Sequence, residues 1–500
     1  MKIGIIGAGV AGLTAAFELR KFGLDVTVFE ATKRIGGRTF TYYFDDDKKL
    51  YGELGAMRFP ITHKYTMHYI NTFDLEVEPF PQTSPETFIY VKDVRVRNDE
   101  DGLSVSEYIY PLFSMFEWEK NTKWFDLIDY IGEYPICSMP QDVRSELVQI
   151  KNNYSPYIDY WDCVSTKKAM RVLGLSFGAI DMISSLDPTL FPFWYDSHIE
   201  VLNEYYTGAF KDLMRIKGGF SRLTESFYNS LTSNTPTEYG DIDFNDLGTV
   251  DFKFSRPIRG IYYDKTSSKI TLKSSDSEYK NLKHDEFDYV VCAIPFSSLR
   301  NVDVYPVFSS IKHQSIREVN YTESQKTLFL CNKRFWQEQG IIDGGGSVTD
   351  LPIGSIWYPK GGKIDEPAVF LASYNLNKDA RRLGTQPIEI RVEMIKRQVE
   401  NVHGLPENYL DDIVEEYASI NWGDEPYELG CFAYFQPEQK KLFSKAMTTP
   451  EFDNKICFAG EHVSVFHGWQ NGAFQTAQKS VRDITRSIGI TSNDLYNVYR

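Results

Sequence analysis

The first thirty residues constrain the fold of this chain more than any other stretch. A short apolar run, residues 2–6, is followed by a glycine-rich turn, Gly7-Ala8-Gly9-Val10-Ala11-Gly12, and by residues 13–22 with apolar positions at helical spacing. A second apolar run, residues 26–29, ends in Glu30. Strand, glycine-rich turn, helix, strand and acid, in this order, predict a Rossmann-like βαβ unit that binds a dinucleotide.

Each glycine of the turn has a separate physical task in this interpretation. Gly7 allows the tight turn, Gly9 lets the backbone approach a pyrophosphate, and Gly12 lets the helix pack close to the strand. The phosphates would lie at the helix N-terminus, near Ala11, where free N–H groups and the helix dipole favour an anion. Glu30 can accept hydrogen bonds from an adenosine ribose. The alternatives are an ordinary βαβ core and a signal peptide, but glycines interrupt the apolar run that a signal peptide needs.

Composition excludes several classes of function. The chain has 500 residues, which predicts two or three domains, and its net charge of −15 argues against a nucleic-acid or anionic-membrane surface. No run approaches the roughly 18 apolar residues of a membrane span. The six cysteines are scattered, as expected for isolated thiols in a reduced compartment. We therefore expect a cytoplasmic protein without nucleic-acid, membrane or metal partners.

Two charged motifs follow the second strand. Ala31 leads into a loop with Gly37 and Arg38, which either contacts phosphate or forms a turn with a solvated arginine. Arg58 follows Gly55-Ala56-Met57 and precedes Phe59-Pro60, an apolar setting for a charge. A buried guanidinium pairs with a planar anion, usually a carboxylate. From the residues alone, an internal salt bridge to Glu53 is favoured over a ligand.

Together these motifs resemble the flavin-dependent amine oxidase superfamily, and within it the L-amino acid oxidases, over nearly the whole chain. The resemblance implies FAD as a non-covalent cofactor and a fold of the α/β and α+β classes. Three domains are implied: a discontinuous Rossmann-like FAD-binding domain (residues 1–62, 216–300 and 446–487), a mixed-sheet substrate-binding domain (63–110 and 301–445) and a helical domain (111–215).

The resemblance also implies roles for single residues. Arg58 would bind the substrate α-carboxylate, with the Tyr374 hydroxyl as a second donor, and relatives that oxidise plain amines lack this arginine. Lys326 would hold a water against flavin N5, Gly468 would lie near the substrate amine, and Trp469 would form a cavity wall. From the residues alone, the lysine could face solvent and the tryptophan could lie in the core. The residues implied to bind FAD are Gly7, Gly9, Ala11, Gly12, Glu30, Ala31, Gly37, Arg38, Gly55, Ala56, Met57, Arg58, Ile258, Trp422, Gly460, Glu461, Gly468 and Trp469.

The implied reaction is oxidative deamination of an L-amino acid, with molecular oxygen as acceptor, to a 2-oxo acid, ammonia and hydrogen peroxide. Aromatic candidates for the cavity favour a large apolar or aromatic side chain, and relatives are commonly homodimers. The alternatives are a monoamine or polyamine oxidase, an amino acid 2-monooxygenase, and a flavin-binding protein without turnover.

Two positions stay open at this stage. Glu204 stands where some L-amino acid oxidases place a histidine that has been proposed as a base, and a surface glutamate is the favoured interpretation. Cys431 stands where monoamine oxidases bond a cysteine to the flavin 8α-methyl group. Because a free cysteine is most often a small buried apolar residue, we expect no covalent bond here.

Overall fold

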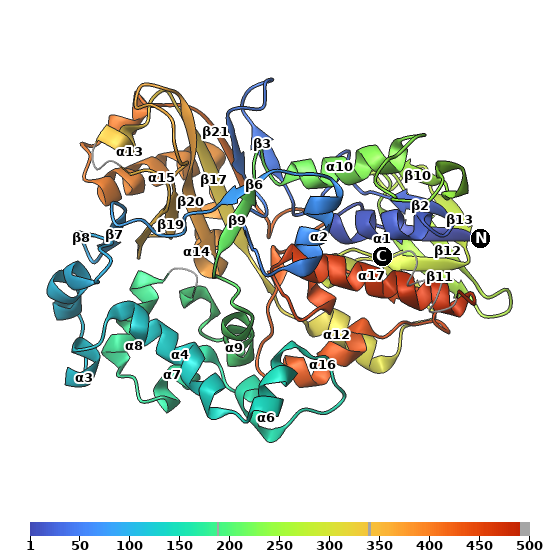
Figure 1. Cartoon of the computed structure of the whole chain (residues 1–500), viewed down its shortest axis with the longest axis horizontal. Helices are drawn as coiled ribbons and strands as arrows, with labels where there is room; N and C mark the ends of the chain where they lie inside the picture. Colours follow the sequence, from blue (N-terminus) through green and yellow to red (C-terminus); the bar gives the residue numbers. More distant parts are fainter. Residues whose placement is uncertain (188–189, 339–341, 491–500) are drawn as a thin grey trace.

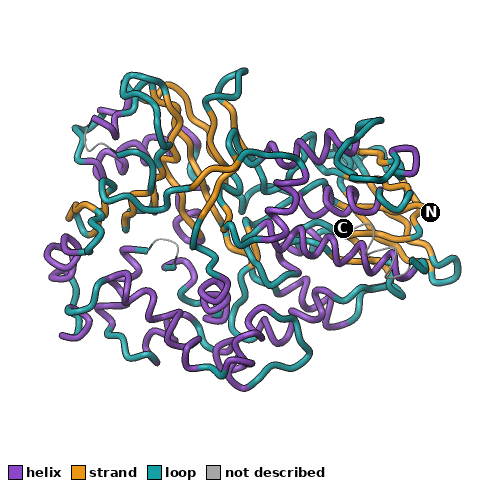
Figure 2. The backbone as a smooth tube through the Cα atoms, viewed as in Figure 1, coloured by secondary structure: helices purple, strands orange, loops and turns teal. Residues whose placement is uncertain are grey.

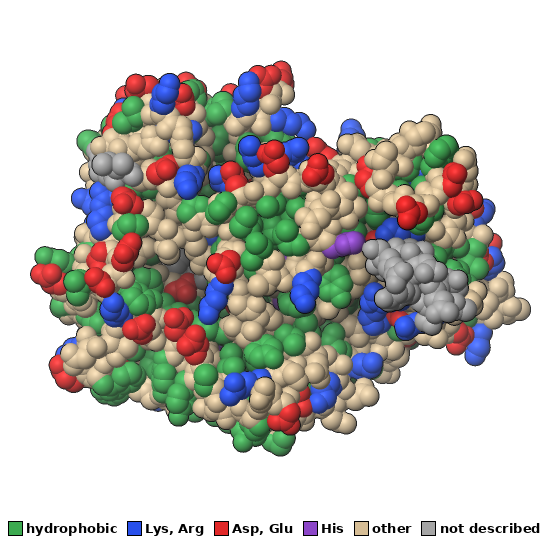
Figure 3. Space-filling view, viewed as in Figure 1, with side chains coloured by type: hydrophobic (Ala, Val, Ile, Leu, Met, Phe, Trp, Pro, Cys, Tyr) green, Lys and Arg blue, Asp and Glu red, His purple; other side chains and the backbone are tan. Residues whose placement is uncertain are grey.

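The computed structural model describes residues 1–187, 190–338 and 342–490. Figure 1 shows a parallel sheet flanked by helices at one end of the molecule and a mixed sheet at the other, with a layer of helices beneath the mixed sheet. The predicted fold class is confirmed, whereas the exact domain limits stay a prediction. Acidic and basic side chains are interspersed on the face shown in Figure 3.

The chain begins in a five-stranded parallel sheet of strand order β10-β2-β1-β14-β23. Its strands come from four separate parts of the sequence: β1 (Lys2–Ile6), β2 (Asp25–Phe29), β10 (Val250–Lys253), β14 (Tyr289–Cys292) and β23 (Ile456–Phe458). Helices α1 (Val10–Arg20), α10 (Ser221–Thr232), α17 (Gln470–Ser487) and the short α2 (Lys64–Thr72) pack together beside it. The discontinuous organisation expected from the motifs is therefore visible in the sheet order.

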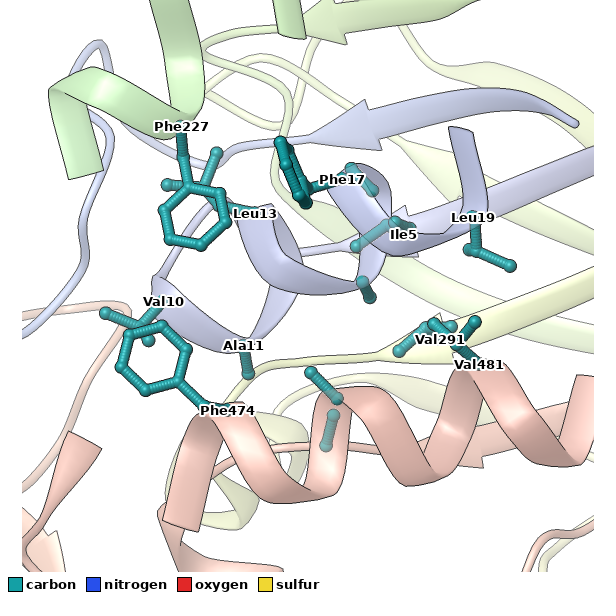
Figure 4. Packing of buried hydrophobic residues seen from close by; sticks show 14 of the residues in the cluster. Ile5, Val10, Ala11, Leu13, Phe17, Leu19, Phe227, Val291, Phe474 and Val481 are labelled. Atoms are coloured by element: carbon teal, nitrogen blue, oxygen red, sulfur yellow. The ribbon is translucent and has the colours of Figure 1, made fainter. Parts of the chain in front are cut away.

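Every residue of α1 is buried, and apolar side chains of α10 and α17 pack against it (Figure 4), together with Tyr69 and Ile70 of α2. The Phe17 ring stacks on Tyr239 at 4.4 Å and meets Phe227 edge-on at 5.5 Å between ring centroids. Burying one such side chain contributes roughly 1.5–3 kcal/mol. Gly12 is necessary for this packing, because a Cβ there would lie 1.9 Å from the Gly7 carbonyl oxygen.

A second sheet covers the opposite side of the parallel sheet. Its strand order is β13-β12-β11-β15, and its strands are β11 (Ile258–Asp264), β12 (Lys269–Ser274), β13 (Lys283–Phe287) and β15 (Asp303–Tyr305). One apolar cluster joins this sheet to strands β1, β2, β14 and β23 and to helices α12 (Ser310–Glu318) and α16 (Gln439–Thr448). The short helix α11 (Phe296–Leu299) lies between β14 and β15 in the chain.

The mixed sheet has seven strands in the order β21-β17-β20-β19-β18-β7-β8. They are β7 (Phe88–Val91), β8 (Val94–Arg97), β17 (Ser324–Cys331), β18 (Gly346–Thr349), β19 (Ser355–Trp357), β20 (Ala368–Leu376) and β21 (Val414–Asn421). Phe329 on β17 packs toward α15 (Ile388–His403), whereas Leu328 and Leu330 pack toward Leu54 and Trp422. The strand is buried on both faces, so its lysine cannot face solvent.

Three short sheets complete the set of strands. They are β3 (Thr41–Tyr43) with β4 (Tyr51–Glu53), β9 (Leu213–Ile216) between β5 (Phe59–Pro60) and β6 (Val77–Pro79), and β16 (Tyr321–Thr322) with β22 (Phe432–Ala433). Two further helices flank the mixed sheet, α13 (Phe335–Glu338) and α14 (Asn377–Gly384).

Residues 117–207, here called the helical region, form the lower layer in Figures 1 and 2. Its helices are α3 (Glu117–Lys120), α4 (Trp124–Ser138), α5 (Gln141–Arg144), α6 (Pro156–Cys163), α7 (Thr166–Val172), α8 (Phe177–Leu186) and α9 (His198–Thr207). The central α9 contacts α4, α6 and α7. Within the described ranges, no helix combines the length and apolar character needed to cross a bilayer.

Candidate active site

One cavity of about 1020 Å³ is lined by the parallel sheet, the mixed sheet and the helical region. With a single exception, the predicted site residues line this cavity: Gly7, Gly9, Ala11, Glu30, Ala31, Gly37, Arg38, Gly55, Ala56, Met57, Arg58, Ile258, Lys326, Tyr374, Trp422, Gly460, Glu461, Gly468 and Trp469. The exception is Gly12, which lies behind the turn and packs on Gly7. The structure therefore brings together positions that are more than four hundred residues apart in the sequence.

The end of the cavity beside β1 has the features of a phosphate cradle. The N–H groups of the first turn of α1, including those of Val10 and Ala11, have no intrahelical acceptor, and no side chain caps this end of the helix. Gly7 adopts φ +98°, and a Cβ on Gly9 would have just one neighbour within 4 Å, the Gly36 carbonyl oxygen. This open helix N-terminus fits the dinucleotide predicted from the sequence.

Glu30 is buried at the end of β2, beside this cradle. Its carboxylate accepts hydrogen bonds from the Ala8 N–H at 2.9 Å and from the Thr32 N–H at 2.9 Å. These bonds hold the side chain in one orientation at the cavity wall. Its contact with a ribose stays a prediction.

Arg38 belongs to a second group of polar residues, around Glu461. Its Nη1 donates to the Glu461 carboxylate at 2.7 Å and to the Cys431 carbonyl oxygen at 2.9 Å, and its Nε lies 3.4 Å from Glu428. The alternative of a solvated arginine is therefore wrong. The Gly468 N–H donates to the other oxygen of Glu461 at 3.1 Å, so one carboxylate joins the loop of Arg38 to the start of α17.

Arg58 lies in an aromatic part of the cavity. Its guanidinium carbon is 4.6 Å from the ring centroid of Trp357, 5.3 Å from Phe80 and 6.0 Å from Phe210. In the described part of the chain Nη1 is buried without a hydrogen-bond partner. Burial lowers the pKa of Arg58 to about 10, which leaves it charged at neutral pH.

The predicted internal salt bridge to Glu53 is wrong. The Glu53 carboxylate instead accepts hydrogen bonds from the Phe220 N–H and the Thr41 hydroxyl, both at 2.8 Å. It also lies near Lys326, and burial raises its pKa. Arg58 is thus a buried cation at the cavity wall that forms no ion pair with a described carboxylate, although the Asp187 carboxylate acts on it electrostatically and raises its pKa.

Lys326 and Tyr374 are cross-strand neighbours on β17 and β20. Lys326 is 3% exposed, and its Nζ donates to the Gly55 carbonyl oxygen at 2.6 Å and lies 4.6 Å from the Tyr374 ring centroid. Burial lowers the pKa of this lysine, although the Glu53 carboxylate opposes the shift. Burial raises the pKa of Tyr374 to about 12, so its hydroxyl is a neutral donor.

Two tryptophans form walls of the cavity. Trp469 lines it and contacts His63 and Phe210 edge-on, at 5.2 and 5.6 Å between ring centroids. Its interpretation as a purely core tryptophan is therefore wrong. Trp422 is buried, and its Nε1 donates to the Leu54 carbonyl oxygen at 2.9 Å.

Cys431 lines the cavity as a free thiol. Its Sγ donates to the Thr322 carbonyl oxygen at 3.0 Å, and burial raises its pKa well above the usual range. A protonated, hydrogen-bonded thiol is a poor nucleophile. These properties favour a non-covalent cofactor.

The interpretation of Glu204 as a surface glutamate is wrong, because this residue lines the cavity from the last turn of α9. Burial raises its pKa to about 8, and the nearby carboxylates of Glu200 and Asp187 add to the shift. Glu200 lies one helical turn earlier and is paired with His467, whose Nδ1 is 3.0 Å away. The four-residue spacing on α9 was the available signal that both glutamates share a face.

The sequence reasoning missed Phe80, Phe210 and Trp357, the three rings around Arg58. They come from three separate segments, so no local motif indicates that they meet. Within the described ranges, no group of three His, Cys, Asp or Glu side chains is arranged to hold a metal ion.

Comparisons with known proteins agree on the family and differ on the substrate. The model of the family described as flavin containing amine oxidoreductase matches residues 10–485. L-amino-acid oxidases from Sistrurus catenatus edwardsii and Bothrops atrox are each 28% identical over 491 residues, which cover 97% of this chain and 87% and 89% of theirs.

Solved structures with the same fold include amine oxidases. Putrescine oxidase bound to putrescine has a TM-score of 0.73 at 19% identity, and cyclohexylamine oxidase from Brevibacterium oxydans has 0.73 at 17%. Each alignment covers 97% of this chain and 99% of the other. At this identity the likeness concerns the fold alone.

Proposed function

Because the chain belongs to the flavin containing amine oxidoreductase family, with FAD as cofactor, we propose that it oxidises L-amino acids. Molecular oxygen is the electron acceptor, and the products are a 2-oxo acid, ammonia and hydrogen peroxide. The amino acid oxidases among its relatives support this substrate class. A cytoplasmic location and a homodimer stay predictions.

The observation that carries the proposal is the state of Arg58. A guanidinium excluded from water needs an anion, and a carboxylate that accepts two parallel hydrogen bonds matches its planar fork. Among the described residues, no carboxylate forms a hydrogen bond or ion pair with this guanidinium; Asp187 acts on it only electrostatically. The α-carboxylate of an amino acid is an anion that would enter the cavity with the substrate, and a plain amine lacks it.

The remaining residues have roles that follow from their positions. Arg58 and the neutral hydroxyl of Tyr374 hold the carboxylate, so the Cα–H bond has one orientation. Such alignment can contribute on the order of 7–11 kcal/mol to the lowering of a barrier. Trp469, Phe210 and Trp357 exclude water from the amine. The bound flavin supplies the two-electron acceptor.

The cofactor site consists of the phosphate cradle of α1, Glu30 and the group around Glu461. The substrate amine must be neutral before it is oxidised, so kcat/KM rises with pH through an alkaline pKa. Lys326 lies beside the cofactor site, and burial lowers the pKa of its ammonium group. A positive charge there stabilises the anionic product of flavin reduction.

The second candidate is a monoamine or polyamine oxidase. The structural neighbours that act on putrescine and cyclohexylamine support it through their fold. Arg58 argues against it, because a buried cation repels the ammonium group of an amine and gains no carboxylate in return. An amino acid 2-monooxygenase would share the carboxylate site and differ in its products.

An anaerobic screen of all twenty L-amino acids, together with putrescine and cyclohexylamine, tests the proposal. Bleaching of the bound flavin at 450 nm by amino acids, and not by the two amines, is the expected result. Ammonia and hydrogen peroxide in aerated samples would identify the oxidase, whereas carbon dioxide would identify the monooxygenase. Reduction by amines alone would refute the proposal, and reduction by none of these compounds would favour a non-catalytic flavin protein.

A further inference from the structure

The helical region gives the cavity a wall of one charge sign. Within the described ranges, its charged residues that line the cavity are Asp129, Asp187 and Glu204; the lysine that follows it in the lining, Lys211, lies beyond the end of α9. They come from three different elements: Asp129 from α4, Glu204 from α9, and Asp187 from the residue that follows α8. The arrangement is therefore produced by the tertiary packing of these helices.

Among the described groups that act on Glu204, none is a compensating cation. The groups that shift its pKa are the carboxylates of Glu200 and Asp187, which oppose ionisation, and the Tyr434 hydroxyl, which donates a hydrogen bond. Glu200 has its own cation partner in His467. No lysine, arginine or histidine in the described part of the chain forms an ion pair with Glu204.

Glu204 and Arg58 belong to the same end of the cavity. Helix α9 ends at Thr207, and the Ala209 N–H donates to the Glu204 carbonyl oxygen at 2.9 Å. The next residue, Phe210, contacts the Arg58 guanidinium. The Asp187 carboxylate interacts electrostatically with both groups, since it raises the pKa of Arg58 and the pKa of Glu204.

The surface around these charges is aromatic and apolar. Phe193, Leu376 and Tyr434 form one apolar cluster, and Phe193 stacks on Tyr434 at 4.2 Å between ring centroids. A long methylene stem packs on such a surface while its charged end reaches a polar group. The cavity thus offers Arg58 to bind a carboxylate, an apolar wall beside it, and Glu204 to bind a cation.

We propose that the preferred substrate is an L-amino acid with a long cationic side chain, such as lysine, and that Glu204 binds its terminal charge. This inference rests on the proposed function, because it places the α-carboxylate on Arg58. It accounts for a carboxylate that is held among aromatic residues and like charges, since the substrate itself supplies the missing cation. The sequence led us to expect a substrate with a large apolar or aromatic side chain. The inference replaces this with a side chain that is apolar along its stem and charged at its end.

The test compares L-lysine with L-norleucine, which has the same main chain of carbons but no terminal charge. In the wild type, kcat/KM for lysine is expected to exceed that for norleucine at pH 9, where Glu204, with its pKa of about 8, is ionised and the lysine side chain is still largely protonated. Glu204→Gln removes the charge with little change in shape and should lower kcat/KM for lysine by about 10- to 100-fold, as expected for the loss of a charge-assisted bond. In the same variant, kcat/KM for norleucine should change by less than about threefold, which is the range of small surface effects.

Control variants separate specificity from damage to the fold. Glu204→Asp keeps the charge and should retain part of the preference for lysine. Glu133→Gln removes a carboxylate from the exposed side of α4, and it should leave kcat/KM unchanged for both lysine and norleucine. Flavin content and circular dichroism of each variant verify that it is folded.

A binding measurement without turnover gives a second readout. 6-Aminohexanoate has a carboxylate and a terminal ammonium but no α-amine, so it can bind but cannot be deaminated at Cα. Its Kd, followed by perturbation of the flavin absorbance, should be lower than that of hexanoate in the wild type and similar to it in Glu204→Gln.

Equal loss for lysine and norleucine in Glu204→Gln, or a wild type that prefers norleucine, would overturn the inference and leave amino acid oxidation intact. Turnover of no amino acid would instead overturn the proposed function. The two failures are therefore distinguishable in one set of assays.

Discussion

Replacing Arg58 by methionine should separate amino acids from amines by a large factor. Methionine keeps an unbranched apolar stem among the three aromatic rings and removes the charge and its donors. Truncating one partner of a buried, hydrogen-bonded charge pair removes about 2–5 kcal/mol. At about 1.4 kcal/mol per tenfold change, kcat/KM for an L-amino acid should fall roughly 30- to 4,000-fold.

The assay uses pairs that differ by the carboxylate alone: L-norleucine with pentylamine, and L-lysine with cadaverine. Peroxide formation gives kcat/KM for each compound in the wild type and in Arg58→Met. The amines make no carboxylate contact, so their kcat/KM should stay the same or rise as a repulsive cation disappears. Arg58→Lys keeps the charge without the planar fork, and should give an intermediate loss.

The same variant should stabilise the protein in the absence of substrate. Burial lowers the pKa of Arg58 from 12.5 to about 10, which corresponds to at most about 3 kcal/mol against the charged form. At any pH below 10 the guanidinium is charged and this cost is fully present, so Arg58→Met should unfold at a higher temperature in a thermal scan. Equal losses on amino acids and amines, with no gain in stability, would refute the role of Arg58 as a carboxylate anchor without an internal partner.

Four further predictions concern the cofactor site. Gly9→Val should abolish FAD binding while the fold persists, because a side chain there enters open space at the helix N-terminus; flavin content and circular dichroism measure both. Gly12→Ala should unfold the protein in the same measurements, because its Cβ would meet the Gly7 carbonyl oxygen. Lys326→Met should slow oxygen consumption at neutral pH. Because burial lowers the pKa of Lys326, the wild-type kcat/KM for oxygen, measured at saturating amino acid, should fall as pH rises through this lowered pKa, and the variant should lack that decrease. Acid precipitation should give a colourless pellet and a yellow supernatant, whereas a yellow pellet that Cys431→Ser makes colourless would show a covalent flavin.

Local signals in the chain were enough to predict the βαβ unit, its turn and its cofactor class. Glycines at Gly7, Gly9 and Gly12, apolar strands on both sides and an acid at the strand end all lie within thirty residues. Their meaning depends on backbone conformation and on spacing along one helix, which the sequence specifies directly. The family motifs extended this to the fold class and to residues that line a common cavity.

The partners of the charged residues depended on the tertiary structure. The sequence favoured Glu53 as the partner of Arg58 and placed Glu204 on the surface, and both interpretations were wrong. A charge is buried, paired or exposed according to segments that are distant in sequence, as the rings of Phe80, Phe210 and Trp357 show for Arg58. Periodicity identifies which residues share the face of a helix, but the packing of that helix decides whether the face meets solvent or a cavity.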